Sequence, residues 1–192
     1  MLGRAEWKTR AHDHAPGLEA ALSSAGFSAG EPESVMLGEA SALIGREAPA
    51  GVTVHLLSEA EEMRQALEVQ DAIFAGVPRA EWMLSELLER QANGEGVELW
   101  AAECDGRIVS AGPMELIAGT AFAGLWGGAT LPEYRQRGIY RALVAARAGS
   151  AMARGARWIE SDCTEFSRPI LERAGLTKVT ETVPWTWERA LG

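Results

Sequence analysis

A basic, glycine-containing segment between residues 128 and 141 has the residue types and spacing of an anion-binding site. A strand-like run ends in Gly128-Ala129-Thr130, and a helix-like run begins within Arg135-Gln136-Arg137-Gly138-Ile139-Tyr140-Arg141. The first N–H groups of a helix have no partner inside the helix and lie at the positive end of its dipole. Glycine lets the backbone approach a phosphate closely, and arginine side chains add charge. The segment therefore predicts a phosphate-binding loop.

Two other kinds of phosphate loop are excluded by residues that the segment lacks. It has no Gly-Lys-Ser/Thr, so it is not a nucleotide P-loop, and it lacks the three spaced glycines of a dinucleotide-binding turn. On the loop alone, the alternative is a helix with a basic first turn and no ligand. The Gly127-Gly128 pair favours a ligand, because glycine inside a strand often marks a close approach, although a bulge without a ligand gives the same pattern.

Carboxylates on a later strand-like run are candidates for a general base. Between Arg157 and Cys163, Glu160 and Asp162 share one face, because side chains alternate along a strand. Such a pair can take a proton directly or through water, and the alternative is that both face solvent. Glu115 is a further candidate. Cys163 has no histidine near it in sequence and is interpreted as a buried thiol.

The elements that must position these residues follow from periodicity and turn signals. The N-terminal part predicts a helix over 16–25, an extended run over 34–37 and a junction at 48–51. A strand over 52–57 leads into a capping box formed by Ser58 and Glu61, and two amphipathic helices follow, ending near Phe74 and Asn93. Strands are predicted over 97–104, 107–117 and 122–131, and Asp105-Gly106 between the first two is a hairpin signal.

The C-terminal part alternates strands and helices. A helix is predicted over 138–154, a strand over 157–163, a short helix over 168–174, and a last strand on which Trp185 and Trp187 share a face and pack in the core. Antiparallel strands followed by a strand-helix-strand crossover predict a mixed sheet of the α/β class with helices on its faces.

Composition limits the class of protein. The chain has 192 residues and a net charge of -9 at pH 7, which argues against nucleic-acid binding because phosphate contacts need a basic surface. No run approaches the roughly 20 apolar residues of a membrane span, and the first residues lack the apolar run of a secretory signal, so we expect a cytoplasmic protein without membrane partners. Two cysteines and three histidines without ligand spacing predict no metal site.

The loop and its surroundings resemble the GNAT superfamily of acetyl-coenzyme A-dependent N-acetyltransferases. The motif of that superfamily is Gln/Arg-x-x-Gly-x-Gly/Ala, and Arg135-x-x-Gly138-x-Tyr140 matches its first two fixed positions. The residues on either side of the motif and the later Gly175-Leu176 are also similar to the family. The resemblance covers roughly residues 52 to 190 and implies a GNAT-like fold, mostly antiparallel with a splayed parallel central pair and flanking helices.

The resemblance also implies roles for individual residues. The backbone of Gly128, Ala129 and Thr130 would face the thioester and pantetheine, and Gln136 to Arg141 would hold the pyrophosphate of acetyl-coenzyme A. Tyr140 stands where glycine or alanine is usual, and we expect it to pack over the cofactor rather than block it. Leu171 stands where many members have a tyrosine acid, so the thiolate would leave unassisted or be protonated through water or Ser167.

The first fifty residues form a separate N-terminal extension in this interpretation, with the acetyltransferase domain at 51–192. Leu22 to Phe27, followed by an acidic extended run, is similar to Leu171 to Leu176 and the strand after it. The extension is therefore interpreted as a vestigial GNAT-like segment, although coincidence explains so short a match as well.

The sequence predicts an N-acetyltransferase that acts by direct amine attack in a ternary complex, as a monomer or homodimer, on a small-molecule or peptide amine. Asp162, Glu160 and Ser167 are its candidate catalytic residues. The alternative is an acyl-coenzyme A-binding sensor or partner domain without catalysis, which the residues at 140 and 171 would equally suit.

Overall fold

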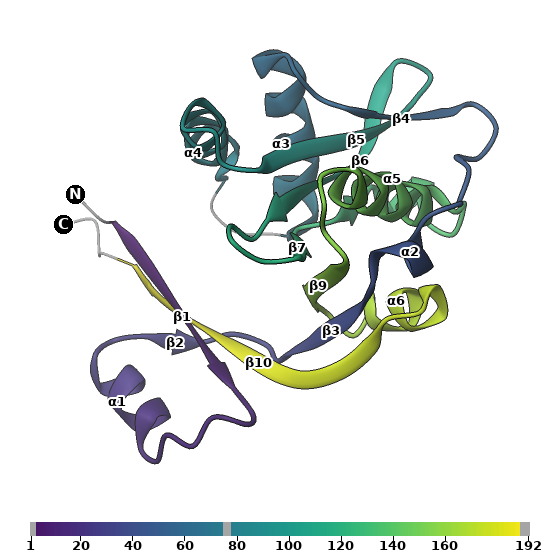
Figure 1. The fold of residues 1–192 in the computed structure, drawn as a ribbon. Coiled ribbons are helices and arrows are strands. Elements are labelled where there is room, and N and C mark those ends of the chain that lie inside the picture. The colour runs from purple at the N-terminus through teal and green to yellow at the C-terminus, as the bar shows by residue number, and fades with distance from the viewer. Residues whose placement is uncertain (1–2, 75–77, 189–192) are drawn as a thin grey trace. The chain divides into compact units, whose positions relative to one another are not determined.

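The computed structural model describes residues 3–74 and 78–188. The chain divides into two compact units. We call Gly38–Ser161 the central unit, and Met1–Leu37 together with Asp162–Gly192 the terminal unit. Figure 1 shows the elements of both, and each unit is described by itself below.

The central unit carries most of the helices and the strands between them. Its elements in chain order are α2 (Ala40–Leu43), β4 (Val52–Leu56), α3 (Ala60–Phe74), α4 (Ala80–Ala92), β5 (Val97–Cys104), β6 (Arg107–Leu116), β7 (Phe122–Leu125), β8 (Ala129–Thr130), the 3-10 helix η1 (Pro132–Tyr134), α5 (Ile139–Ala153) and the greater part of β9 (Trp158–Cys163).

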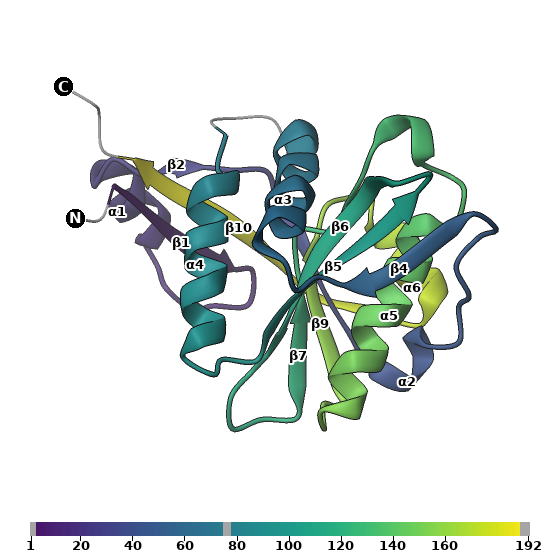
Figure 2. The same cartoon turned by 90° about the horizontal axis from the view of Figure 1, so that it is seen from above.

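The strands of the central unit form a mixed sheet in the order β9-β7-β6-β5-β4, with β8 also paired to β6 (Figure 2). The pairs β4–β5, β5–β6, β6–β7 and β6–β8 are antiparallel. The pair β7–β9 is parallel, with Phe122 opposite Trp158 and Gly124 opposite Glu160. This arrangement confirms the predicted mixed α/β sheet with a central parallel pair.

The β5–β6 hairpin forms at the predicted turn. Asp105 has φ 50° and Gly106 has φ 75°. Left-handed backbone at both central residues matches the right-handed twist of the flanking strands, which is why Asp-Gly is favoured there. The hairpin signal is confirmed.

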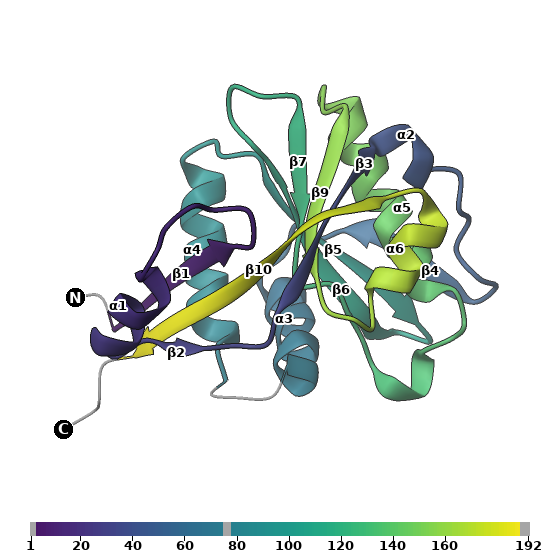
Figure 3. The ribbon, with the colours of Figure 1, turned by 90° about the horizontal axis from the view of Figure 1, so that it is seen from below.

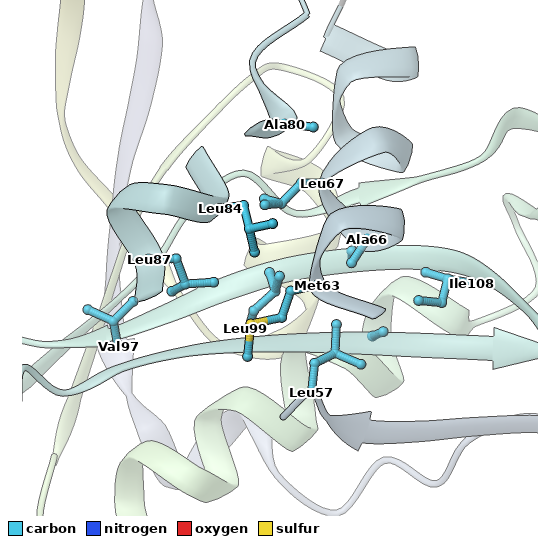
Figure 4. Close-up of a cluster of buried hydrophobic side chains, with 12 residues drawn as sticks. Leu57, Met63, Ala66, Leu67, Ala80, Leu84, Leu87, Val97, Leu99 and Ile108 are labelled. Carbon is cyan, nitrogen blue, oxygen red and sulfur yellow. The ribbon is translucent and has the colours of Figure 1, made fainter. Parts of the chain in front are cut away.

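Helices α3 and α4 cover one face of this sheet and α5 packs on the other. Leu99 and Ala111 belong to a buried cluster with side chains of α3 and α4, as Figure 4 shows for Leu67, Leu84 and their neighbours. Gly112, the next residue after Ala111, instead faces Arg147 of α5. Neighbouring strand residues point to opposite faces, so the two sets of helices lie on opposite sides.

Two sequence predictions about this unit need correction. α3 begins at Ala60 and not at Ser58, because Met63 N–H donates to the carbonyl of Glu59, which therefore supplies the first helical acceptor. The predicted single strand over 122–131 is interrupted, because β7 ends at Leu125 and β8 begins at Ala129. The side chains that cause this interruption belong to the candidate site.

The terminal unit combines both ends of the described chain. Its elements are β1 (Arg4–Arg10), α1 (Leu18–Ser24), β2 (Ser28–Ala29), the greater part of β3 (Glu33–Glu39), α6 (Arg168–Ala174) and β10 (Thr177–Glu188). β10 lies between β1 and β3 and also pairs with β2, always antiparallel (Figure 3). Trp185 is buried, as predicted, whereas Trp187 on the same face is only half-buried.

The first residues thus share a compact unit with the last strand. The division into an N-terminal extension over 1–50 and an acetyltransferase domain over 51–192 stays a prediction. The origin of residues 1–50 as a vestigial module stays a prediction. Within residues 3–74 and 78–188, no helix has the length and apolarity that crossing a membrane requires.

Candidate functional site

The interruption between β7 and β8 is held open by side chains from both faces of the central sheet. Gln70 of α3 donates through Nε2 to the carbonyl of Gly127 at 2.7 Å. Arg147 of α5 donates through Nη1 to the carbonyls of Pro113, at 3.0 Å, and Trp126, at 3.3 Å. Gly127 has φ 51°, a conformation that favours glycine. We call Trp126–Gly128 the strand break.

The strand break also ends the parallel pairing of β7 with β9. The last backbone pair is Gly124 with Glu160. One residue further, the Ser161 hydroxyl donates to the Leu125 carbonyl at 2.7 Å. Beyond this point the chain pairs with β6 through β8, with Ala129 opposite Ala111.

Two glycines make room for the side chains beneath the strand break. A Cβ on Gly112 would lie 2.6 Å from Nη1 of Arg147. A Cβ on Gly128 would lie 2.8 Å from the Tyr140 ring, 3.1 Å from Nη2 of Arg147 and 3.3 Å from the Tyr140 hydroxyl. Contacts below 3.0 Å exclude any side chain at these two positions without movement of the neighbours. The close approach at Gly128 is therefore made by the side chains of Tyr140 and Arg147, whereas the sequence pattern favoured a ligand there.

Arg147 is a buried cation without an acidic neighbour. Its side chain is 1% exposed. Burial lowers the pKa of its guanidinium, and the interaction with the Tyr140 hydroxyl acts in the opposite direction. Among the residues that the structure describes, no carboxylate forms an ion pair with it. Its charge is solvated mainly by backbone carbonyls. Burial of a charge in this way costs folding free energy, so we expect the guanidinium to have a structural or functional role.

The segment after β8 forms the predicted basic turn at the start of α5. Gln136 has φ 63° and Gly138 has φ 85°, and α5 begins at the next residue, Ile139. Left-handed residues of this kind occur in loops whose N–H groups gather into anion-binding concavities. A Cβ on Gly138 would lie 3.5 Å from Nη2 of Arg141 and 3.7 Å from Pro49, which are ordinary contacts, so glycine is favoured there by the positive φ and not by crowding.

Arginine side chains surround this turn and remain exposed. Arg135 donates through Nε to the Thr130 carbonyl at 3.1 Å, which closes the turn onto β8. Arg137 lies over the Tyr134 ring, 5.1 Å from its centroid. Arg135, Arg137 and Arg141 are all exposed, so their charges reach solvent beside the helix N-terminus. Together with the first N–H groups of α5, they form a site that suits a phosphate or pyrophosphate.

The predicted cofactor-binding residues therefore form one continuous segment of the central unit, from the strand break to the first turn of α5. The structure also brings the first part of this segment, Gly128, against Tyr140 in the last part. Tyr140 is half-buried, and its ring fills the space that a side chain at residue 128 would need.

The predicted catalytic carboxylates are both engaged in contacts. Asp162 accepts a hydrogen bond from Nζ of Lys8 at 2.7 Å, and its Oδ1 is buried without a hydrogen-bond partner. Burial lowers the pKa of Lys8, but Asp162 and Glu33 together outweigh it and raise that pKa above its ordinary value. Glu160 is half-buried and also has an interaction partner.

The remaining candidates have less to offer. Ser167 is half-buried at the N-cap of α6, where its hydroxyl makes no capping hydrogen bond. Glu115 pairs with Arg90. Burial first, and the nearby carboxylates second, raise the pKa of the Cys163 thiol to about 11, so it is a poor nucleophile at neutral pH. The catalytic roles of Asp162, Glu160 and Ser167 stay predictions.

Sequence reasoning missed the two residues that hold the strand break, Gln70 and Arg147. Both occupy the apolar stripe of a helix: Gln70 follows Met63, Ala66 and Leu67, and Arg147 follows Leu143 and precedes Ala151. A polar side chain at such a position must find partners inside the protein. Their helical spacing was the signal that could have identified them.

A comparison with known protein families identifies the family to which the part of the chain that carries this site belongs. A family model described as an acetyltransferase (GNAT) domain matches residues 45–162, more than half of the chain. The matched part contains the strand break, the basic turn and α5. The chain belongs to the GNAT acetyltransferase family.

Solved structures share the fold at low sequence identity. A GCN5-related N-acetyltransferase from Kribbella flavida has a TM-score of 0.65 and 20% identity over 95% of this chain and 67% of its own. A tandem GNAT protein from the clavulanic acid biosynthesis pathway has a TM-score of 0.66 and 15% identity, over 96% and 64%. An acetyltransferase with acetyl-coenzyme A from Clostridium acetobutylicum has a TM-score of 0.57 and 13% identity, over 67% and 91%. No curated protein sequence matches the chain. The chain thus spans about two thirds of the first two proteins.

Replacing Arg147 by Met should destabilise the central unit. The carbonyls of Pro113 and Trp126 lose charged donors worth about 1.5–3 kcal/mol each, and relief of the buried charge offsets part of that loss. We expect the free energy of unfolding to fall by about 2 kcal/mol in chemical denaturation. Arg141→Met, at an exposed position of the same helix, should change it by less than about 0.5 kcal/mol. Equal effects of both substitutions would refute the supporting role of Arg147.

The raised pKa of Cys163 predicts a pH-dependent reactivity. In a Cys104→Ser background, the alkylation rate of the folded protein should rise about tenfold per pH unit and level off only near pH 11, because the thiolate is the reactive form. A raised folded-state pKa also means that stability is lost as the pH rises from the unfolded-state value, near 8.5, toward 11. Alkylation measured by mass spectrometry across pH 7–11 tests this, and a plateau below pH 9 would contradict it.

Proposed function

We propose that this chain is an N-acetyltransferase that transfers an acetyl group from acetyl-coenzyme A to a primary amine by direct attack in a ternary complex. The observation that carries the proposal is the continuity between the strand break and the basic turn. One stretch of backbone offers N–H groups to a thioester at one end and to a pyrophosphate at the other.

The turn is the proposed pyrophosphate site. Residues Gln136 to Arg141 supply left-handed backbone, unpaired helical N–H groups and exposed guanidinium groups. The thioester and pantetheine would run along Gly128, Ala129 and Thr130, and the presence of acetyl-coenzyme A in a protein of the same fold supports this donor.

The strand break orients a donor for the carbonyl oxygen of the thioester. The Gly127 carbonyl points to Gln70, and every peptide bond described is trans. In a trans peptide the C=O and the following N–H point in opposite directions, so the Gly128 N–H points away from Gln70. A fixed N–H in a partly dehydrated site stabilises the negative charge that develops on a carbonyl oxygen during attack.

The reaction also requires two proton transfers, one from the attacking amine and one to the departing thiolate. A lysine-like amine with a pKa of about 10.4 costs about 4.6 kcal/mol to deprotonate at pH 7, whereas a thiol with a pKa near 8.5 costs only about 2 kcal/mol to leave as a thiolate. A base therefore contributes more than an acid. We assign the base to Asp162 or Glu160, and the thiolate leaves unassisted or takes a proton from water or from a hydroxyl such as that of Ser167. The acceptor is a small-molecule or peptide amine, and the protein works in the cytoplasm as a monomer or homodimer.

A second candidate function is a domain that binds acyl-coenzyme A without catalysis. It is favoured by the ion pair of Asp162 with Lys8, which occupies a candidate base, and by Leu171, an aliphatic side chain at the position of the usual acid. Thiol release in the presence of a panel of amines separates the two functions, because a binding domain releases none.

Substitution of Gly138 should abolish donor binding. A valine there would project into the space proposed for the pyrophosphate and would also strain a residue with φ 85°. Gly155 at the other end of α5 has φ 96° and open space around it, so Gly155→Val carries the same strain without the block. We expect calorimetry with acetyl-coenzyme A to show at least a 100-fold weaker Kd for Gly138→Val and an unchanged Kd for Gly155→Val. Equal affinity of the two variants for acetyl-coenzyme A would show that the turn is not part of the binding site.

The role of Asp162 can be separated from its ion pair. Asp162→Asn removes the carboxylate, whereas Lys8→Met breaks the same pair and leaves the carboxylate in place. If Asp162 is the base, Asp162→Asn should lower kcat by about 100-fold, the usual scale for a general base, and Lys8→Met should lower it much less. Steady-state thiol release measures both. Equal losses of kcat in the two variants would show that the Lys8–Asp162 ion pair is structural and that Asp162 is not the base.

A further inference from the structure

We propose that Tyr140 is the catalytic acid that protonates the departing thiolate of coenzyme A, and that Arg147 is the positioning residue that holds it. This inference rests on the proposed function. It starts from the juxtaposition of the Tyr140 hydroxyl, the guanidinium of Arg147 and the Gly128 backbone at the strand break.

The helix geometry places the two side chains together. Tyr140 is the second residue of α5, and Arg147 lies two turns further along the same face. From the position of a Cβ on Gly128, the Tyr140 hydroxyl is 3.3 Å away and Nη2 of Arg147 is 3.1 Å away. Both polar ends thus meet beside the residue whose N–H is the proposed donor to the thioester oxygen.

The electrostatics suit a proton donor. The guanidinium is fully buried and carries a charge that no carboxylate among the described residues compensates. When a proton leaves the tyrosine hydroxyl, the remaining negative charge on the oxygen faces this cation. A charge-assisted contact in a dry environment is stronger than the same contact in water. The buried guanidinium of Arg147 therefore stabilises the phenolate that forms when Tyr140 gives up its proton.

Other hydroxyl groups near the strand break already have partners. Ser110 donates to the Ala129 carbonyl at 2.7 Å, and its oxygen lies 2.7 Å from that of Thr130. The chain has only two tyrosines, and the other, Tyr134, lies under the guanidinium groups of Arg107 and Arg137. Leu171 has no proton to give. Tyr140 is thus the hydroxyl best placed to serve as the acid.

The step balances as follows. The amine nitrogen forms a bond to the carbonyl carbon, the carbon–sulfur bond breaks, and its electron pair leaves on sulfur. The Tyr140 hydroxyl transfers its proton to that sulfur, giving the free thiol and the amide. The phenolate, held beside Arg147, regains a proton from the one that the amine released to the base or to water.

Tyr140→Phe tests the acid, because it keeps the ring over Gly128 and removes only the hydroxyl. We expect kcat for acetyl transfer to fall by about 10- to 100-fold, toward the low end of acid–base contributions, while KM for acetyl-coenzyme A changes by less than about threefold. A fall in affinity that accounts for the whole loss of rate would overturn the inference, because it would assign the hydroxyl to binding.

Binding without turnover gives a second readout. Calorimetry should show that the wild-type protein binds coenzyme A about 10-fold more tightly than desulfo-coenzyme A, because the hydroxyl contacts the sulfur. Tyr140→Phe should bind both with equal affinity. Arg147→Lys should weaken the preference in the wild-type background and change nothing further in the Tyr140→Phe background, since the two residues act as one unit. An unchanged preference in Tyr140→Phe would overturn the inference even if the variant were inactive.

The outcomes separate this inference from the proposed function. A wild-type protein that releases no thiol with any amine would overturn both. A wild-type protein that is active, with a Tyr140→Phe variant of equal kcat, would overturn only the role of Tyr140 and leave acetyl transfer standing.

Discussion

The buried guanidinium of Arg147 is the interaction on which the rest of the central unit depends. It donates to the carbonyls of Pro113 and Trp126, and the second of these lies in the gap between β7 and β8. Gly112 and Gly128 are glycines because the guanidinium and the Tyr140 ring occupy the space of their side chains. One cation in the middle of a helix thus determines the path of the backbone that the proposed thioester would follow.

Gln70 completes this arrangement from the opposite face. A strand break exposes peptide groups that would otherwise pair, and unpaired buried groups are costly. Gln70 takes the Gly127 carbonyl and Ser161 takes that of Leu125. Side chains thus satisfy the carbonyls of Trp126 and Gly127 in the break and that of Leu125 just before it, while the Gly128 N–H keeps its direction. α5 contributes at two levels, with Arg147 near its middle and an anion-binding turn at its start.

The features that the sequence predicted well are local ones. The Asp105-Gly106 turn and the helix end at Gly155 depend on residues next to one another, and both glycines adopt the positive φ that their positions suggested. The strand break depends on Gln70, which lies 57 residues from Gly127, so neighbouring residues carry no sign of it. In the same way, Asp162 looked like a free carboxylate because its partner, Lys8, lies 154 residues away. Pairings over such separations are fixed by the fold and not by local pattern.

Binding an acyl-coenzyme A and transferring its acyl group place different demands on the same backbone. The proposed pyrophosphate site uses the turn at the start of α5, whose positive φ values at Gln136 and Gly138 and exposed arginines lie apart from Arg147 in the sequence. A buried arginine that pairs with no carboxylate among the described residues, with a tyrosine ring against it, costs desolvation and requires glycine at two positions of the sheet. In acetyl transfer, negative charge develops at the strand break when the thiolate leaves. A tyrosine hydroxyl and a buried guanidinium at that place would stabilise this charge. For this reason the interior of α5, more than its basic first turn, favours an enzyme over a binding domain.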